Sequence, residues 1–171
     1  MNKNNTFKKY LPSLVYGGSD GAVSYFSLMA GAYGAGVPLK ILIAIGISNV
    51  MADGLSMASA DYLSEDSRNQ KNTNPLFDAF FTFISFVLLG LIPLMPTLYA
   101  YNFYGPDSLL SFYTFIVSTL VTLCAFIFIG YVRGKVLKRN LFRTILQSVF
   151  ICSASAIVAY FVGEYVAKIL I

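Results

Sequence analysis

The chain has 171 residues, a net charge of +4, 57% hydrophobic residues and only 12% charged residues. Because soluble domains carry roughly 25% charged residues, this composition excludes an ordinary water-soluble globular domain. The absence of histidine from the sequence excludes His-based zinc, haem and acid–base chemistry, and basic residues that flank apolar segments give no reason to expect nucleic acid as a partner.

Apolar segments long enough to cross a bilayer define the class of protein. Residues 109–132 and 144–163 contain no charged residue, and each exceeds the roughly 18 apolar residues that mark a transmembrane helix. We therefore expect an all-α integral membrane protein, with membrane lipid around a single transmembrane domain over residues 1–171. Its five predicted spans cover residues 11–38, 40–62, 77–101, 108–132 and 142–167.

The distribution of basic residues predicts the orientation of these spans. Of the twelve Lys and Arg residues, only Lys40 and Lys168 fall on the side reached after the first span. Cytoplasmic connections carry an excess of Lys and Arg, so the N-terminus is predicted to be cytoplasmic and the C-terminus outside. The basic residues on the cytoplasmic side are Lys3, Lys8, Lys9, Arg68, Lys71, Arg133, Lys135, Lys138, Arg139 and Arg143.

The first span contains Asp20, for which two interpretations are open. Ser19 or Asp20 could cap a helix over residues 21–38, which would be about 27 Å long and would nearly span the bilayer. If the helix instead begins near Leu11, Asp20 lies about halfway through the membrane, on a polar face of small residues. Such a face allows close helix packing and lines cavities or dimer seams. Its other members are Ser24, Ser27 and Gly31.

The second span carries four polar or sulfur-containing side chains one helical turn apart, namely Asn49, Asp53, Met57 and Asp61. Asp53 lies roughly 18 Å into this span, close to the membrane midplane. An aspartate at that depth costs about 2.5–3.5 kcal/mol, which indicates a compensating partner or a function. Carboxylate and amide oxygens suit hard and borderline cations, and a thioether prefers softer ones. The pattern therefore favours a divalent transition metal.

Each member of this set also has a simpler interpretation. Met57 could fill the core, Asp53 could accept a hydrogen bond from a Ser or Tyr on a neighbouring helix, and Asp61 could be solvated at the inner interface. Two cations of another kind, Na⁺ and Mg²⁺, would bind equally well to oxygen ligands alone. These alternatives remain open from the sequence.

The remaining spans carry structural signals. Asp78 follows an Asn-Pro pair, which places its carboxylate in the first turn of the third helix, where it complements the helix dipole. Pro93 and Pro96 predict a kink or an unwound turn near the other end of that span. Glu164 is expected at an interface beside Lys168. The two cysteines, Cys124 and Cys152, lie inside apolar segments and are predicted to behave as small buried hydrophobic residues.

With these motifs the sequence resembles the vacuolar iron transporter family of divalent-metal/proton antiporters. The resemblance lies in "SDGAVSYFSLMAGAYGAG" in the first span, "GLSMASADYLS" in the second and "NPLFDAFFTFISFVLLGLIPLMP" in the third. It implies a homodimer whose first helices line a path between protomers, through which Fe²⁺, and often Mn²⁺, leaves the cytoplasm in exchange for protons. It also implies that Asp20 is an intramembrane acid of this path and that Met57 contacts the metal.

The chain departs from the family pattern in two places. Many members have a cytoplasmic metal-collecting domain between the second and third spans, but the link "SEDSRNQKNTNP" is too short for one, so the chain is interpreted as a short member. Several members have a Glu where this chain has Asn49, and Asp53 occupies a position that is usually small or apolar.

Together these observations predict a Fe²⁺ and Mn²⁺ exporter in which Asp20, Asn49, Asp53 and Met57 form the intramembrane metal site. Asp61 and Glu65 are predicted to receive the ion at the cytoplasmic mouth. Carboxylates that bind metal when ionised and release it when protonated produce exchange directly. We expect no cofactor other than the transported ion.

Two further functions stay open, a transporter of Na⁺, Mg²⁺ or an organic cation and a membrane scaffold that uses Asp53 to join helices. The sequence shows no nucleophile–base arrangement, so an enzyme is not predicted. The compact organisation favours a prokaryotic inner (plasma) membrane, with an organelle membrane as the alternative.

Overall fold

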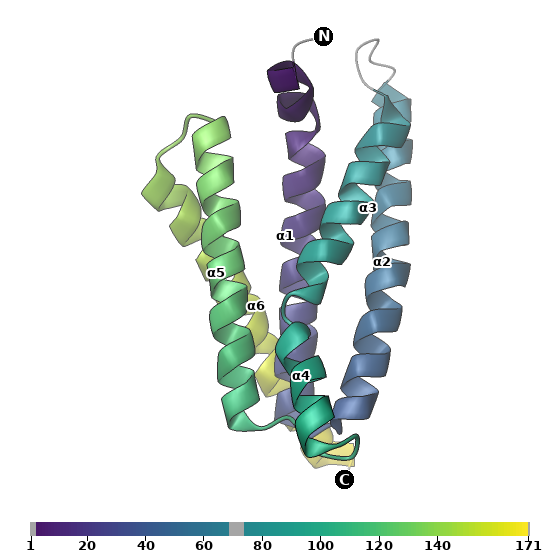
Figure 1. Cartoon of the computed structure of the whole chain (residues 1–171), viewed down its shortest axis with the longest axis vertical. Helices are drawn as coiled ribbons and strands as arrows, with labels where there is room; N and C mark the ends of the chain where they lie inside the picture. Colours follow the sequence, from purple (N-terminus) through teal and green to yellow (C-terminus); the bar gives the residue numbers. More distant parts are fainter. Residues whose placement is uncertain (1–2, 69–73, 171) are drawn as a thin grey trace.

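The computed structural model describes residues 3–68 and 74–170 of the chain, which form a bundle of helices (Figure 1). The predicted all-α class is confirmed. Lys71 and most of the predicted linker before the third span lie outside the described residues. The helices are α1 (Lys3–Ala35), α2 (Leu39–Arg68), α3 (Pro75–Leu91), α4 (Met95–Tyr104), α5 (Phe112–Val136) and α6 (Leu141–Leu170).

Four stretches within the described residues are long and apolar enough to cross a membrane, and each contains one of the predicted spans. α3 and α4 together form one of them, and the others are α2, α5 and α6. The remaining predicted span lies in α1, whose 33 residues correspond to about 50 Å but include many small and polar side chains. Figure 1 shows α1 in the middle of the bundle and the two chain termini at opposite ends. The side of the membrane on which each end lies stays a prediction.

The first helix resolves the two interpretations of Asp20. α1 runs without a break from Lys3 to Ala35 and has Pro12 inside it. A helix that begins at residue 21 with a cap at Ser19 or Asp20 is therefore wrong, and the longer helix is confirmed. Asp20 lies in its middle.

The third predicted span is a broken helix. Asn74 caps α3, because its side chain accepts a hydrogen bond from the backbone N–H of Leu76 at 3.1 Å, and Asp78 lies in the first turn as predicted. α3 ends at Leu91, the chain turns through residues 92–94, and α4 then begins. Proline cannot donate the backbone hydrogen bond that would continue the helix, so the predicted interruption is confirmed.

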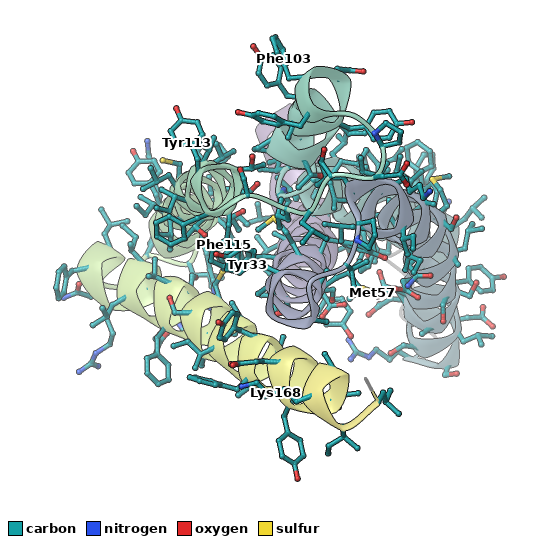
Figure 2. All side chains as sticks on the ribbon, turned by 90° about the horizontal axis from the view of Figure 1, so that it is seen from below. Tyr33, Met57, Phe103, Tyr113, Phe115 and Lys168 are labelled. Carbon is teal, nitrogen blue, oxygen red and sulfur yellow. The ribbon has the colours of Figure 1, made fainter. Side chains whose placement is uncertain are left out.

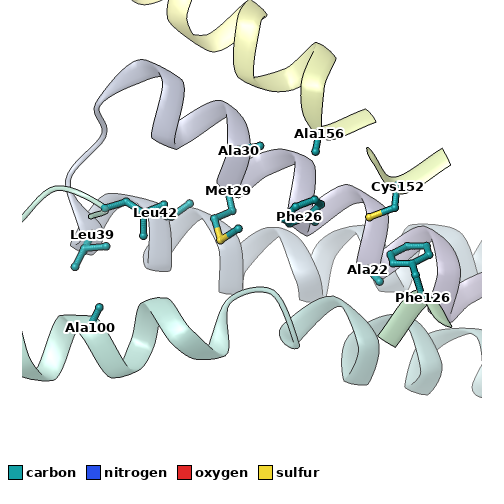
Figure 3. Close-up of a cluster of buried hydrophobic side chains, with 11 residues drawn as sticks. Ala22, Phe26, Met29, Ala30, Leu39, Leu42, Ala100, Phe126, Cys152 and Ala156 are labelled. Atoms are coloured by element: carbon teal, nitrogen blue, oxygen red, sulfur yellow. The ribbon is translucent and has the colours of Figure 1, made fainter. Parts of the chain in front are cut away.

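Close contacts with α3 and α6 hold α1 in the centre. A Cβ atom at Gly21 would overlap the backbone carbonyl of Phe86 in α3, and one at Gly163 in α6 would overlap that of Gly31. The predicted role of Gly31 in close helix packing is thus confirmed. Figure 3 shows the main buried cluster along α1, with side chains from α2, α4, α5 and α6 around it. Its members are Ala22, Phe26, Met29, Ala30, Leu39, Leu42, Ala100, Leu110, Phe126, Cys152 and Ala156.

The outward surface of the bundle is apolar, which suits contact with lipid. Cys152 belongs to the buried cluster as predicted, but Cys124 is exposed, so its predicted burial is wrong. The reason is that both faces of α5 are apolar, and Cys124 lies on the outer one. Large exposed side chains on α5 and α6 include Phe112, Leu120, Phe128, Phe142, Leu146, Phe150, Val158 and Phe161.

Two connections at one end of the bundle are joined by backbone hydrogen bonds. The N–H of Leu39 donates to the carbonyl of Ser108 at 2.8 Å, and the N–H of Lys40 donates to the carbonyl of Pro106 at 3.1 Å. The Lys40 ammonium also forms an ion pair with Asp107. We call this pairing of residues 38–40 with 106–109 the loop clip.

Candidate functional site

One side of α2 presents the predicted ligands at the surface of the chain. Asn49 and Asp53 are exposed, and Met57, Asp61 and Glu65 are half-buried. The opposite side of the helix is buried against the bundle through Val50, Gly54 and Ala58. The four-residue spacing therefore keeps this set on one side of the helix, as the sequence predicts, while the side chains differ in exposure.

Asp53 is held by a tyrosine on the neighbouring helix. The hydroxyl of Tyr25 in α1 donates a hydrogen bond to Oδ2 of Asp53 at 2.9 Å. Tyr25 is only 1% exposed, and its ring packs edge-on against Phe86 in α3 with 6.0 Å between the ring centroids. The bond from a neighbouring Ser or Tyr, which the sequence left open as an alternative, is thus present. Asp53 itself remains accessible.

Asp20 lies near this pair and on an open surface of α1. Its carboxyl group interacts electrostatically with Asp53, and both carboxyls interact with Tyr25. Asp20 lines a hollow of about 470 Å³ together with Tyr16 and with Arg133 from α5. In the isolated chain Asp20 is exposed, so it is deep along the helix but not enclosed by its own bundle.

A second hollow of about 350 Å³ contains Asp61 and Glu65. Thr82 in α3 donates a hydrogen bond from Oγ1 to Oδ2 of Asp61 at 2.5 Å, and Arg68 pairs with Glu65 at 2.9 Å. Pro12 and Tyr16 line both hollows, which therefore flank the same segment of α1. The structure thus separates the predicted ligands into an Asp20–Asp53 group and an Asp61–Glu65 group.

Met57 lies between these groups and faces inward. It packs against a buried cluster that consists of Tyr25, Val50, Phe86 and Leu94. The thioether thus adjoins the ring of Tyr25, which fits the core-filling interpretation as well as a place beside the metal path. In the view along the bundle, α2 and α6 lie on opposite sides of α1, with Met57 on α2 (Figure 2).

A single chain offers few carboxylates to one ion. Among the residues that the structure describes, no three His, Cys, Asp or Glu side chains lie close enough together to hold a metal. Hard and borderline cations in proteins usually take more ligands than two carboxylates supply. Any metal at Asp20 and Asp53 therefore needs ligands from water or from another chain.

Sequence reasoning missed three side chains of the site. Tyr25 and Thr82 each bind a carboxylate on α2 from another helix, and Arg133 shares a hollow with Asp20. Periodicity within one helix carries no information about such partners, because they depend on how neighbouring helices are rotated. The only signal was general, since a buried acid requires some donor.

Comparison with known proteins adds a family and three relatives. The model of the VIT family matches residues 11–72 and 65–164 of this chain. A vacuolar iron transporter of Toxoplasma gondii is 36% identical over 63 residues, which are 37% of this chain and 21% of that protein. Vacuolar iron transporters of Plasmodium falciparum and Plasmodium berghei are 31% and 30% identical over 37% and 36% of this chain. The matched segments cover only 23% and 22% of those two proteins.

Proposed function

Since the chain belongs to the VIT family, we propose that it carries Fe²⁺, and with it Mn²⁺, across the membrane in exchange for protons. The chain is an integral membrane protein, and its family is not one of enzymes. Iron is supported by the names of the three relatives, which share short segments with this chain. Exchange and the second metal are supported by the chemistry of the site.

The observation that carries the proposal is the interacting pair of Asp20 and Asp53 on an otherwise apolar surface. Two carboxylates close together in a low dielectric repel each other, and either a divalent cation or a proton relieves this repulsion. Binding of the metal and binding of a proton are then mutually exclusive at the same oxygens. That competition is the physical basis of exchange.

A second copy of the chain is the proposed partner. Asp20, Asn49 and Asp53 are exposed in the single chain, and exposure of carboxylates to lipid is costly. A two-fold dimer places the same surface on both protomers, so it would cover these side chains and bring two further carboxylates to the ion. The homodimer and the path between its first helices are parts of the proposal.

The hollow with Asp61 and Glu65 is proposed as the mouth at which the ion enters. The direction, out of the cytoplasm, follows from the predicted orientation of the spans. The location in a prokaryotic inner membrane rests on the compact organisation of the chain and stays a prediction, while the names of the relatives refer to a vacuole.

The test is metal flux into proteoliposomes under an imposed pH gradient. Wild-type protein should accumulate Fe²⁺ and Mn²⁺, and Asp53→Asn should reduce this flux at least tenfold, which corresponds to about 1.4 kcal/mol or more. Asp66→Asn is the matched control, because Asp66 is exposed on the same helix near its end. It should transport like the wild type.

Other outcomes distinguish the alternatives. Flux of Mg²⁺ or Na⁺ that competes equally with Fe²⁺ would indicate a transporter of another cation. No flux in any variant, with a destabilised Asp53→Asn protein, would make Asp53 a structural contact between α1 and α2 and would refute the proposal.

A further inference from the structure

The hydroxyl of Tyr25 is placed on Asp53 by a rigid set of contacts. The ring of Tyr25 is buried in a cluster with Val50 and Phe86. A Cβ atom at Gly90 would come within 3.0 Å of this ring, so the glycine leaves the space that the ring occupies. The phenol therefore has one position, and its oxygen lies 2.9 Å from Oδ2 of Asp53.

The carboxylate that receives this bond is the mobile partner. Asp53 is exposed on α2, where an aspartate side chain without a partner samples several rotamers. A hydrogen bond to a charged acceptor is stronger than one to a neutral acceptor and fixes its geometry. The bond thus arises from a buried, fixed donor and acts on an accessible acid, which is the arrangement that prepares a ligand for binding.

We propose that Tyr25 is a positioning residue of the metal site, whose hydroxyl holds Asp53 through Oδ2 and favours the ionised carboxylate that takes up the metal. This inference rests on the proposed function in that it assigns metal binding to Asp53. It goes beyond it because Tyr25 sets the pH at which the carboxylate changes its proton for the metal. Tyr25 itself does not contact the ion.

The groups around Asp53 determine the sign of this effect. From α1, Tyr25 donates to the carboxylate and Asp20 opposes its charge. α3 presents the rings of Phe83 and Phe86 to the adjacent Gly54. A donor to the charged form favours ionisation and a neighbouring anion disfavours it, so loss of the Tyr25 hydroxyl leaves the repulsion unbalanced.

The remaining acids on the facing elements have donors of their own. Asp78, the single ionisable residue in the sequence of α3, accepts a hydrogen bond from Ser13 at 3.1 Å. Asp61, two turns along α2 from Asp53, accepts one from Thr82. The donor to Asp53 is therefore specific to Tyr25, and its removal should act on Asp53 first.

The experiment measures binding of Mn²⁺, and of Fe²⁺ without oxygen, to the purified full chain in detergent over a series of pH values. Tyr25→Phe keeps the ring and removes only the hydroxyl. We expect about fivefold weaker binding near neutral pH and loss of binding at a pH about one unit higher than in the wild type. Tyr33→Phe is the matched control, because Tyr33 is on the same helix and its ring stacks on Phe115 at 4.5 Å. It should leave the pH profile unchanged.

A double variant separates positioning from simple helix contact. In the Asp53→Asn background, Tyr25→Phe should cause no further loss of metal affinity. If Tyr25→Phe lowers the thermal stability but leaves the wild-type pH profile, the inference is wrong and the bond only joins α1 to α2. An equal loss of affinity with and without Asp53 would also refute it.

Failure of the proposed function gives a different pattern. Wild-type protein that binds Mn²⁺ but shows no gradient-driven flux would refute transport, while the pH profile of Tyr25→Phe would still decide the inference. Wild-type protein that binds neither metal would overturn the inference itself.

Discussion

The hydroxyl side chains of α1–α3 and those of α5–α6 form different kinds of hydrogen bond. In α5 and α6 the hydroxyls bond within their own helix, such as Thr122 to the carbonyl of Ser118 at 2.7 Å and Ser148 to that of Thr144 at 3.0 Å. In α1–α3, three hydroxyls cross to a carboxylate on another helix. These pairs are Tyr25 with Asp53, Thr82 with Asp61 and Ser13 with Asp78.

The difference separates structural polarity from functional polarity. A hydroxyl that bonds to its own helix is satisfied without a neighbour, so it is compatible with lipid and with any packing. A hydroxyl that fixes a carboxylate on another helix depends on the relative position of two helices and controls an acid. The proposed ion path accordingly lies in α1–α3, and α5–α6 support it.

The largest effect should come from an acid of the first region. Asp20→Asn removes one of two interacting carboxylates, and we expect a loss of proton-driven metal flux of more than tenfold, or about 1.4 kcal/mol or more. Glu164→Gln is the counterpart in α6, where the acid pairs with Lys168 at 2.6 Å, and its flux should stay within about twofold of wild type. Equal losses in both variants would remove the distinction between the regions.

A smaller effect is expected from the matched threonines. Thr82→Val removes the donor to Asp61, so the metal concentration for half-maximal flux should rise about three- to fivefold, as for loss of about 1 kcal/mol. Thr122→Val removes only a bond within α5 and should leave this concentration unchanged. Initial rates over a range of Mn²⁺ concentrations measure both. A shift in the α5 variant of the same size would contradict the comparison.

The smallest effect concerns two ion pairs. Arg68 is 60% exposed where it pairs with Glu65, so Arg68→Gln should change stability by no more than about 1 kcal/mol. Because Glu65 then lacks its cation, metal capture at low ionic strength should improve by about twofold at most, and high salt should abolish the gain. Lys168→Gln, at the pair with Glu164, should give no gain. Tighter capture that persists in high salt would show that screening is not the cause.

Features that depend on one segment were predictable from the sequence. The apolar spans follow from length and hydropathy, the break near Pro93 follows from the missing backbone donor, and the common side of Asn49 and Asp53 follows from helical periodicity. Each of these needs only the residues of a single helix. The structure confirms all three.

Features that depend on the rotation of one helix against another were not predictable. Cys124 and Cys152 have similar neighbours in sequence, but only Cys152 faces α1. A helix that is apolar on every side has no moment to fix its rotation, so packing decides it. For the same reason the sequence allowed a Ser or Tyr partner for Asp53 without identifying Tyr25, which is 28 residues away.

The loop clip makes the bundle mechanically unequal along its length. Among the described residues, the two backbone bonds from Leu39 and Lys40 are the ones that join different connections between helices. Helices tied together at one end can separate most easily at the other, as in a hinge. The two hollows that flank α1 lie near that other end, beside residues 11–23, 60–68 and 133–137. Small changes of angle at the clip therefore become large displacements where the acids of the mouth are.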